Sequence, residues 1–199
     1  MFKKILSVVN LLRDIIVSPI KVFERINKDQ LSFEVYIIFL LGALVTFLRT
    51  LRLEGQSIHF FETERINKVL SFLAVPQIKW GFTYITFFLF ILILYLFSKI
   101  FLKRIRPKPL FLCLMSISGV GLIMQALFFV FHYIFSQNVN FFLTYIAFAW
   151  VVILSLLAIK CSQEISIGKS LFLFVIAGLP TIFIAGLTGI SPYLAWMAL

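Results

Sequence analysis

Five long apolar stretches follow one another along most of the chain, and each is separated from the next by polar or charged residues. They cover about residues 35–53, 80–100, 110–135, 141–159 and 171–190. A helix rises about 1.5 Å per residue, so roughly 20 apolar residues cross a hydrocarbon core about 30 Å thick. The pattern predicts an all-α polytopic membrane protein with five transmembrane helices in one membrane domain, 35–190, and a short tail at 191–199.

The first stretch is the least regular of the five. Its uninterrupted apolar part, Val35–Leu48, is shorter than the hydrocarbon core, and Arg49 and Arg52 follow it. Arg49 must reach outward with its long side chain if this helix is to span. We expect it to span, because otherwise the dense basic segment KIFLKRIRPK at 99–108 would lie on the outer side.

Residues 1–34 predict two short amphipathic interfacial helices before the membrane domain. In the first, apolar residues recur at one helix face and polar residues take the opposite face: Ile5, Val8, Val9, Leu12, Ile15 and Ile16 against Lys3, Ser7, Asn10 and Asp14. This helix either lies in the membrane interface or packs on the rest of the protein. The segment SPIKVFERINK at 18–28 predicts a second helix, with Ser18 as its cap and Pro19 in its first turn.

The third and fourth stretches should form an antiparallel hairpin. No Asp, Glu, Lys or Arg occurs from Pro109 to Ile159, and only the short segment SQNVN at 136–140 separates the two stretches. Within the third stretch, SISGVG at 116–121 combines Ser and Gly. We interpret it as a thin part of the helix where a neighbouring helix approaches closely.

Composition and charge support a membrane location. Of the 199 residues, 62% are apolar, against about 45–50% in soluble domains. Lys and Arg total 18 while Asp and Glu total 8, and the basic residues flank the apolar stretches. Anionic lipid headgroups and membrane topology explain this excess better than nucleic acid, so no nucleic-acid partner is expected.

The basic residues also predict the orientation. With a cytoplasmic N-terminus and five spans, few basic residues lie outside: Arg49, Arg52, Arg65, Lys68 and Lys79. The positive-inside rule therefore predicts a cytoplasmic N-terminus and an external C-terminus. The short loops between the stretches suit a protein of the cell membrane. The segment 50–79 either forms a surface helix or dips into the bilayer.

The chain offers little for catalysis. No Asp or Glu lies centrally in a stretch, and neither HExxH nor GxSxG occurs. Cys113 and Cys161 lie in or beside apolar runs without a CxxC or Cys/His pattern, so no metal site is predicted. We expect a protein that is not an enzyme and has no cofactor.

Two polar or small-residue patterns are candidate sites. Ser118, Gln125 and His132 recur every seven residues on one helix face, which indicates either a polar groove or hydrogen bonding between helices. A second pattern of small residues, spaced by four, indicates either a face that docks another helix or packing inside the bundle: Ala177, Thr181, Ala185 and Gly189. Candidate lipid-headgroup contacts are the N-terminal cations Lys3, Lys4, Arg13, Lys21, Arg25 and Lys28.

Several segments in combination resemble the Yip family, the Ypt/Rab-interacting multi-pass membrane proteins, in its short prokaryotic form. These are SPIKVFERI before the first stretch, RPKPLFLCLMSISGVGLIMQALF at the third, FAWVVILSLLAIKCSQEISIGKS from the fourth to the fifth, and AGLP in the fifth. The resemblance covers most of 15–185. It implies five spans, a cytoplasmic N-terminus and no catalytic residues.

We therefore expect a membrane adaptor or organiser that binds membrane lipids and another membrane protein, or a second copy of itself, or that shapes the bilayer. The alternative is a small carrier or channel subunit for a lipid or solute, with Ser118, Gln125 and His132 as its polar path.

Overall fold

The computed structural model describes residues 2–52, 76–102, 104–132 and 137–187. Within these ranges the chain forms seven α-helices and no strand. They are α1 (Phe2–Val17), α2 (Pro19–Asn27), α3 (Ser32–Arg52), α5 (Pro76–Phe101), α6 (Pro107–His132), α7 (Gln137–Gln163) and α8 (Ile167–Leu187).

A helix lies at each of the five predicted apolar stretches, so the all-α prediction is confirmed for the described ranges. Three helical segments there are long and apolar enough to cross a bilayer: Tyr84–Phe101, Pro107–Met124 and Tyr145–Gln163. The apolar segments of α3 and α8 are shorter, at Ser32–Thr46 and Ile167–Phe183. That all five helices span stays a prediction. Most of 50–79 and the tail 191–199 lie outside the described residues.

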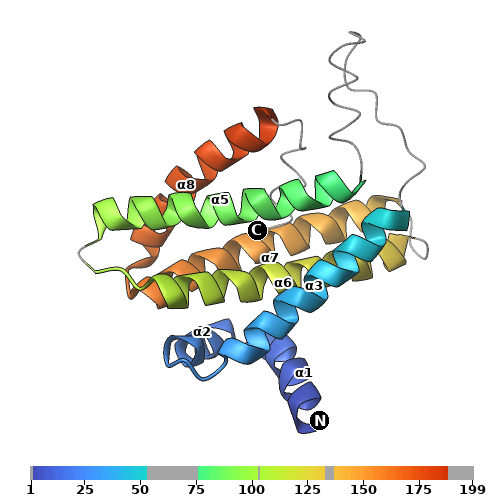
Figure 1. The fold of residues 1–199 in the computed structure, drawn as a ribbon, viewed down its shortest axis with the longest axis horizontal. Coiled ribbons are helices and arrows are strands. Elements are labelled where there is room, and N and C mark those ends of the chain that lie inside the picture. Colours follow the sequence, from blue (N-terminus) through green and yellow to red (C-terminus); the bar gives the residue numbers. More distant parts are fainter. Residues whose placement is uncertain (1, 53–75, 103, 133–136, 188–199) are drawn as a thin grey trace.

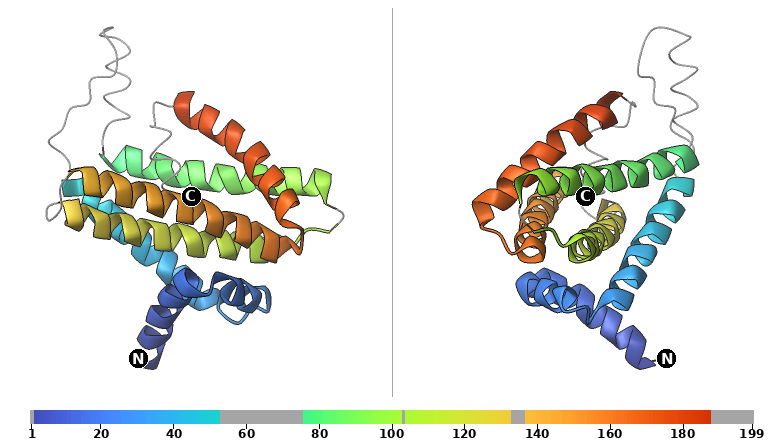
Figure 2. Two further views of the ribbon diagram at one scale, coloured as in Figure 1. Left: turned by 180° about the vertical axis from the view of Figure 1, so that it is seen from behind. Right: turned by 60° about the vertical axis from the view of Figure 1, so that its left-hand side comes forward.

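The helices form one bundle with α1 and α2 on its flank. Helices α5, α6 and α7 run alongside one another, α3 crosses α6 obliquely, and α8 diverges from α5 towards its C-terminal end (Figure 1). The turned views in Figure 2 place α1 and α2 together outside the bundle, with the N-terminus at the projecting end of α1.

Helix α6 is the centre of the bundle. In its segment Pro107–Met124, 67% of the residues are buried, against 33% in Tyr84–Phe101 of α5 and 28% in Tyr145–Gln163 of α7. The outer helices therefore expose apolar side chains, as a bundle surrounded by lipid does. Only α6 is enclosed by protein over most of its described length.

Helices α3 and α6 make the most extensive contact of the bundle, and glycines bring their backbones together. A Cβ on Gly42 would lie 2.7 Å from the Gly119 carbonyl oxygen, and one on Gly119 would lie 2.9 Å from the Ile38 carbonyl oxygen. Lipid tails are as apolar as Leu, so helices in a bilayer associate by close packing. The close neighbour predicted for SISGVG is thus confirmed, and it is α3.

Helix α5 packs in a different way, through aromatic rings. Phe39 of α3 stacks on Phe87 with ring centroids 5.8 Å apart, and Phe90 meets Phe174 of α8 edge-on, also at 5.8 Å. Such pairs contribute about 0.5–1.5 kcal/mol beyond the area that they bury. Phe residues thus form much of the packing of α5 against α3 and α8.

The antiparallel hairpin of α6 and α7 is confirmed, and a glutamine joins its ends. Gln163, the last residue of α7, is buried and donates from Nε2 to the Arg106 carbonyl oxygen at 2.9 Å. The Arg106 amide in turn donates to Gln163 Oε1 at 3.1 Å. One side chain therefore satisfies both backbone groups just before α6 begins at Pro107, whose missing N–H costs nothing at this position.

Helix α2 lies against the bundle, mainly on α7. Its apolar residues Val22, Phe23 and Ile26 are buried in the protein, whereas Ile20 is exposed. As expected, Ser18 precedes the helix and Pro19 opens it, but the Ser18 side chain makes no capping hydrogen bond. The sequence pattern located α2 correctly, and its apolar face packs mostly on protein.

The close contact of α3 and α6 gives the first test. Gly119→Ala should destabilise the protein by about 1–3 kcal/mol, because the new methyl group meets the backbone of α3 and the helices must separate. Gly168→Ala is the matched control, since nothing lies within 4 Å of a Cβ at that residue. The apparent melting temperature in detergent should fall for Gly119→Ala and not for Gly168→Ala. An equal effect of the two substitutions would contradict the close contact.

Candidate functional site

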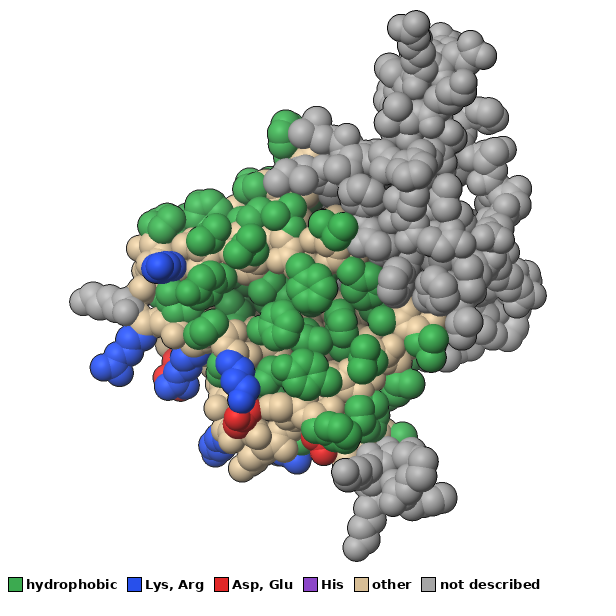
Figure 3. Space-filling model, in the orientation of Figure 1, with side chains coloured by type: hydrophobic (Ala, Val, Ile, Leu, Met, Phe, Trp, Pro, Cys, Tyr) green, Lys and Arg blue, Asp and Glu red, His purple; other side chains and the backbone are tan. Residues whose placement is uncertain are grey.

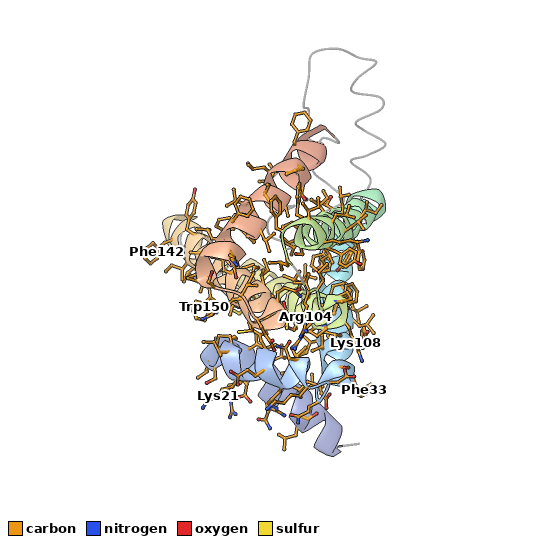
Figure 4. All side chains as sticks on the ribbon, turned by 90° about the vertical axis from the view of Figure 1, so that its left-hand side faces the viewer. Lys21, Phe33, Arg104, Lys108, Phe142 and Trp150 are labelled. Carbon is orange, nitrogen blue, oxygen red and sulfur yellow. The ribbon has the colours of Figure 1, made fainter. Side chains whose placement is uncertain are left out.

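One end of the bundle gathers the charged side chains, and we call it the basic end. It is formed by the C-terminal ends of α5 and α7, the N-terminal ends of α6 and α8, and α2. Figure 3 shows Lys and Arg, with Asp and Glu beside them, at the left and lower edges of the molecule, while hydrophobic side chains are spread over the rest of the visible described surface. Figure 4 looks onto this end, with Arg104 and Lys108 near the start of α6 and Lys21 on α2.

Two acidic residues hold the start of α6. Asp29 follows α2 and pairs with Lys108, and Glu164 follows α7 and pairs with Arg106 at 2.6 Å. These are also the two non-glycine residues with positive φ in the described ranges, at 60° and 55°. Each ends its helix in a left-handed turn, with the next amide bonded back to the helix: Gln30 to Arg25 and Ile165 to Lys160. The turns aim both carboxylates at α6.

A further hydrogen bond attaches α2 to α7. Asn27, the last residue of α2, donates from Nδ2 to the Cys161 carbonyl oxygen at 2.7 Å. Together with the buried Val22, Phe23 and Ile26, it fixes the helix on the bundle. The outward side of α2 then carries Lys21, Glu24 and Arg25, and Lys28 follows the helix; all four side chains are exposed.

Most cations of the basic end have no acidic partner. Among the described residues, the ion pairs use Arg13, Arg106 and Lys108. The basic side chains there that make no ion pair are Lys21, Arg25, Lys28, Lys99, Arg104, Lys160 and Lys169. A surface with so many uncompensated cations favours anions, and the headgroups of acidic lipids are the anions nearest to a membrane bundle.

The predicted headgroup contacts belong to this surface only in part. Lys21, Arg25 and Lys28 are exposed on α2, and Arg13 is exposed on α1 but donates to Asp14 at 2.8 Å. The side chains of Lys3 and Lys4 lie outside the described residues. Four unpaired cations of the basic end were not among the predicted contacts: Lys99, Arg104, Lys160 and Lys169. Their position beside apolar stretches was a signal that could have identified them.

Of the predicted polar line Ser118, Gln125 and His132, the structure describes the side chain of one residue, Ser118. Ser118 is buried in α6 beside Gly119, where α3 crosses. The side chains of Gln125 and His132 lie outside the described residues, so the groove formed by the three stays a prediction.

Two members of the small-residue pattern in α8 lie inside the protein. Ala177 and Thr181 are buried, and the Thr181 hydroxyl donates to the Ala177 carbonyl oxygen at 2.8 Å. The Ala185 side chain and Gly189 lie outside the described residues. A docking face that uses all four residues therefore stays a prediction.

The described residues contain no group of three His, Cys, Asp or Glu that could hold a metal ion. Cys113 is buried and Cys161 is half-buried, and both are free thiols. The unpaired cations of the basic end, in contrast, indicate a class of ligand, namely anions.

The ion pair of Asp29 predicts a pH dependence. The Lys108 ammonium, and next the Ser32 hydroxyl, lower the pKa of the Asp29 carboxyl below 3.8 by hydrogen bonding. A lowered pKa means that the stabilisation is complete above the unfolded pKa and is lost as the pH falls through the folded one. At neutral pH the melting temperature of the wild type should therefore be higher than that of Asp29→Asn. The difference should begin to shrink as the pH falls below about 4 and should vanish once the pH is below the lowered pKa of the folded state.

Asparagine suits this test because it tolerates the left-handed backbone and can still accept from Ser32. In a protein that carries Lys108→Gln, the substitution Asp29→Asn should lower the melting temperature less than it does in the wild type, already at neutral pH. A difference that stayed constant into the acid range would contradict the role of the ionised carboxylate.

Comparison with known proteins finds one family whose model matches most of the chain. The Yip1 domain family matches residues 13–190, which include all of α2 to α8. No curated protein and no solved structure matches the chain. The match spans most of the chain, from within α1 to beyond the end of α8, and so it includes every helix that forms the basic end. The chain therefore belongs to the Yip1 domain family.

Proposed function

We propose that this protein is a non-enzymatic membrane organiser whose basic end gathers anionic lipids and presents them, with the bundle, to a partner membrane protein. The supporting observation is the set of seven basic side chains without ion pairs at one end of an apolar helical bundle. Each cation near an acidic membrane surface contributes about 1 kcal/mol of attraction.

The rigid attachment of α2 adds to this argument. Val22, Phe23 and Ile26 are buried against the protein and Asn27 bonds to Cys161, so the exposed cations of α2 are held at a fixed place relative to α6 and α7. A flexible basic tail would attract the same lipids without ordering them around the bundle. The docked helix instead favours a fixed arrangement of headgroups beside the protein.

The proposed location is the cell membrane, with the N-terminus and the basic end in the cytoplasm and the C-terminus outside. Cytoplasmic leaflets carry the acidic lipids that attract basic residues. The partner would be a membrane protein or a second copy of this chain. We do not propose the carrier alternative, because Ser118 is buried next to the tight crossing of α3 and α6.

The test is native mass spectrometry of the protein extracted gently from its own membrane. The wild type should retain acidic phospholipids at near-stoichiometric amounts. The triple variant Lys21→Gln, Arg25→Gln and Lys28→Gln should lose most of them, because all three side chains are exposed and none makes an ion pair.

The charge-matched control is Arg65→Gln, Lys68→Gln and Lys79→Gln, which removes three cations from the segment that we expect on the opposite side of the membrane. This variant should keep its acidic lipids. Equal lipid loss from the two triple variants would contradict the proposal, since the basic end would then have no special role.

A further inference from the structure

Helix α1 carries apolar side chains on the part of its surface that packs on the other helices and also on a part that they leave exposed. Its buried residues Val8, Leu11 and Ile15 face the bundle. Four other apolar residues are exposed to 58%, 54%, 39% and 71%: Leu6, Val9, Ile16 and Val17. Isolated apolar residues on a surface need no explanation, but a run of them along one helix does.

The side chains of α1 divide into three arcs when they are placed at about 100° per residue. The buried residues Val8, Leu11 and Ile15 form the first. The exposed apolar residues, together with Arg13, form the second. Ser7, Asn10 and Asp14 form a polar third arc between them. Each arc takes roughly a third of the circumference, so three different environments surround the helix.

Two of these environments are identified by contacts and chemistry. The first is the protein, because α1 packs on α2, α3 and α6 and Ser7 donates to Glu34 at the start of α3 at 3.3 Å. The polar arc, with Asn10 exposed, suits water. The environment of the second, exposed apolar arc is left to identify. It must accept four apolar side chains and Arg13, whose long stem lets its charge reach a polar layer.

We propose that the second, exposed apolar arc of α1 lies at the boundary between headgroups and acyl chains in an acidic leaflet. Helix α1 is inserted there, while α2 is not. The inference deepens the proposed function and rests on it, because it takes the basic end as the side that meets an anionic bilayer surface. The inserted residues are Leu6, Val9, Ile16 and Val17.

The level of α1 relative to the bundle supports this occupant. Ser7 donates a hydrogen bond to Glu34, so α1 contacts the first turn of α3. The exposed Phe33 and Tyr36 begin the outward apolar side of α3 there. Aromatic residues at such a level are typical of membrane interfaces. With 16 residues, α1 is about 24 Å long, too short to cross a core of about 30 Å, so it lies along the surface.

Charge distinguishes the bilayer from the other possible occupant, a second copy of the chain. The uncompensated cations beside α1 are those at α2, which α1 contacts: Lys21, Arg25 and Lys28. A second copy docked on α1 would bring its own such cations towards them, whereas an acidic leaflet supplies the opposite charge. Binding of an amphipathic helix strengthens with buried apolar area and with attraction to anionic lipid; α1 supplies the apolar area and the neighbouring α2 supplies the charge.

The test measures the environment of single cysteines in the full chain. Cys113→Ala and Cys161→Ala remove the native thiols, and Val9→Cys, Ile16→Cys, Asn10→Cys and Lys21→Cys are then labelled with an environment-sensitive dye. The proteins are reconstituted in vesicles of phosphatidylcholine and phosphatidylglycerol. Iodide quenches dyes in water, and a lipid with a nitroxide at the top of its acyl chain quenches dyes at the boundary.

Dyes at residues 9 and 16 should be quenched by the lipid nitroxide and should be several-fold less sensitive to iodide than the dye at residue 10. The dye at residue 21 on α2 should behave like the one at residue 10. In vesicles of phosphatidylcholine alone, protection of residues 9 and 16 from iodide should decrease.

Two results would overturn the inference. Iodide sensitivity at residues 9 and 16 equal to that at residue 10 would place the arc in water. Protection from iodide without nitroxide quenching would place it against protein, as a second copy or partner would. Either failure leaves lipid retention by the basic end untouched, since mass spectrometry of the α2 triple variant measures that separately.

Discussion

The backbones of α3 and α6 meet where Gly42 and Gly119 face each other, and the rest of the bundle is arranged around this contact. A Cβ at either residue would come within 3 Å of the opposite backbone. In lipid, no hydrophobic force draws one apolar helix to another, so the gain must come from packing at short range. The contact encloses α6 on one side, and α7 encloses it on another through the hairpin and Gln163. Helix α5 contacts α3 and α8 instead through large aromatic rings.

A central α6 also explains why the charged residues of the basic end are organised as they are. Arg106 and Lys108 stand at the start of the most enclosed helix and are held by Glu164 and Asp29 from the ends of α7 and α2. A left-handed conformation costs a residue with a side chain roughly 1–2 kcal/mol, and here it directs each carboxylate to its cation. The acids near α6 are thereby occupied. The outer cations of α2, α5 and α8 remain available to anions, which is the basis of the proposed lipid contacts.

The sequence predicted the helices well because lipid imposes a simple rule: long apolar stretches form helices, and charges lie at their ends. It predicted the close neighbour at Gly119 because small residues thin a helix locally. It did not identify Gly42 as the facing residue, since nothing in one sequence pairs two glycines so distant. The Asp29–Lys108 pair was missed for the same reason. For α1, periodicity located the apolar arc around Val8 and Val9, but only the fold shows that protein covers Val8 and leaves Val9 exposed.

The proposed function requires α2, the turn between α5 and α6, and the start of α8 to lie together on one side of the membrane as one basic end. The most direct test uses Lys28→Cys, Arg104→Cys and Lys169→Cys, each made singly without the native thiols, and a maleimide that cannot cross membranes. The account predicts that all three react from the same side, because an even number of crossings separates them. Reaction of Arg104→Cys from the side opposite to Lys28→Cys would show that α3 or α5 does not cross, and would contradict the account.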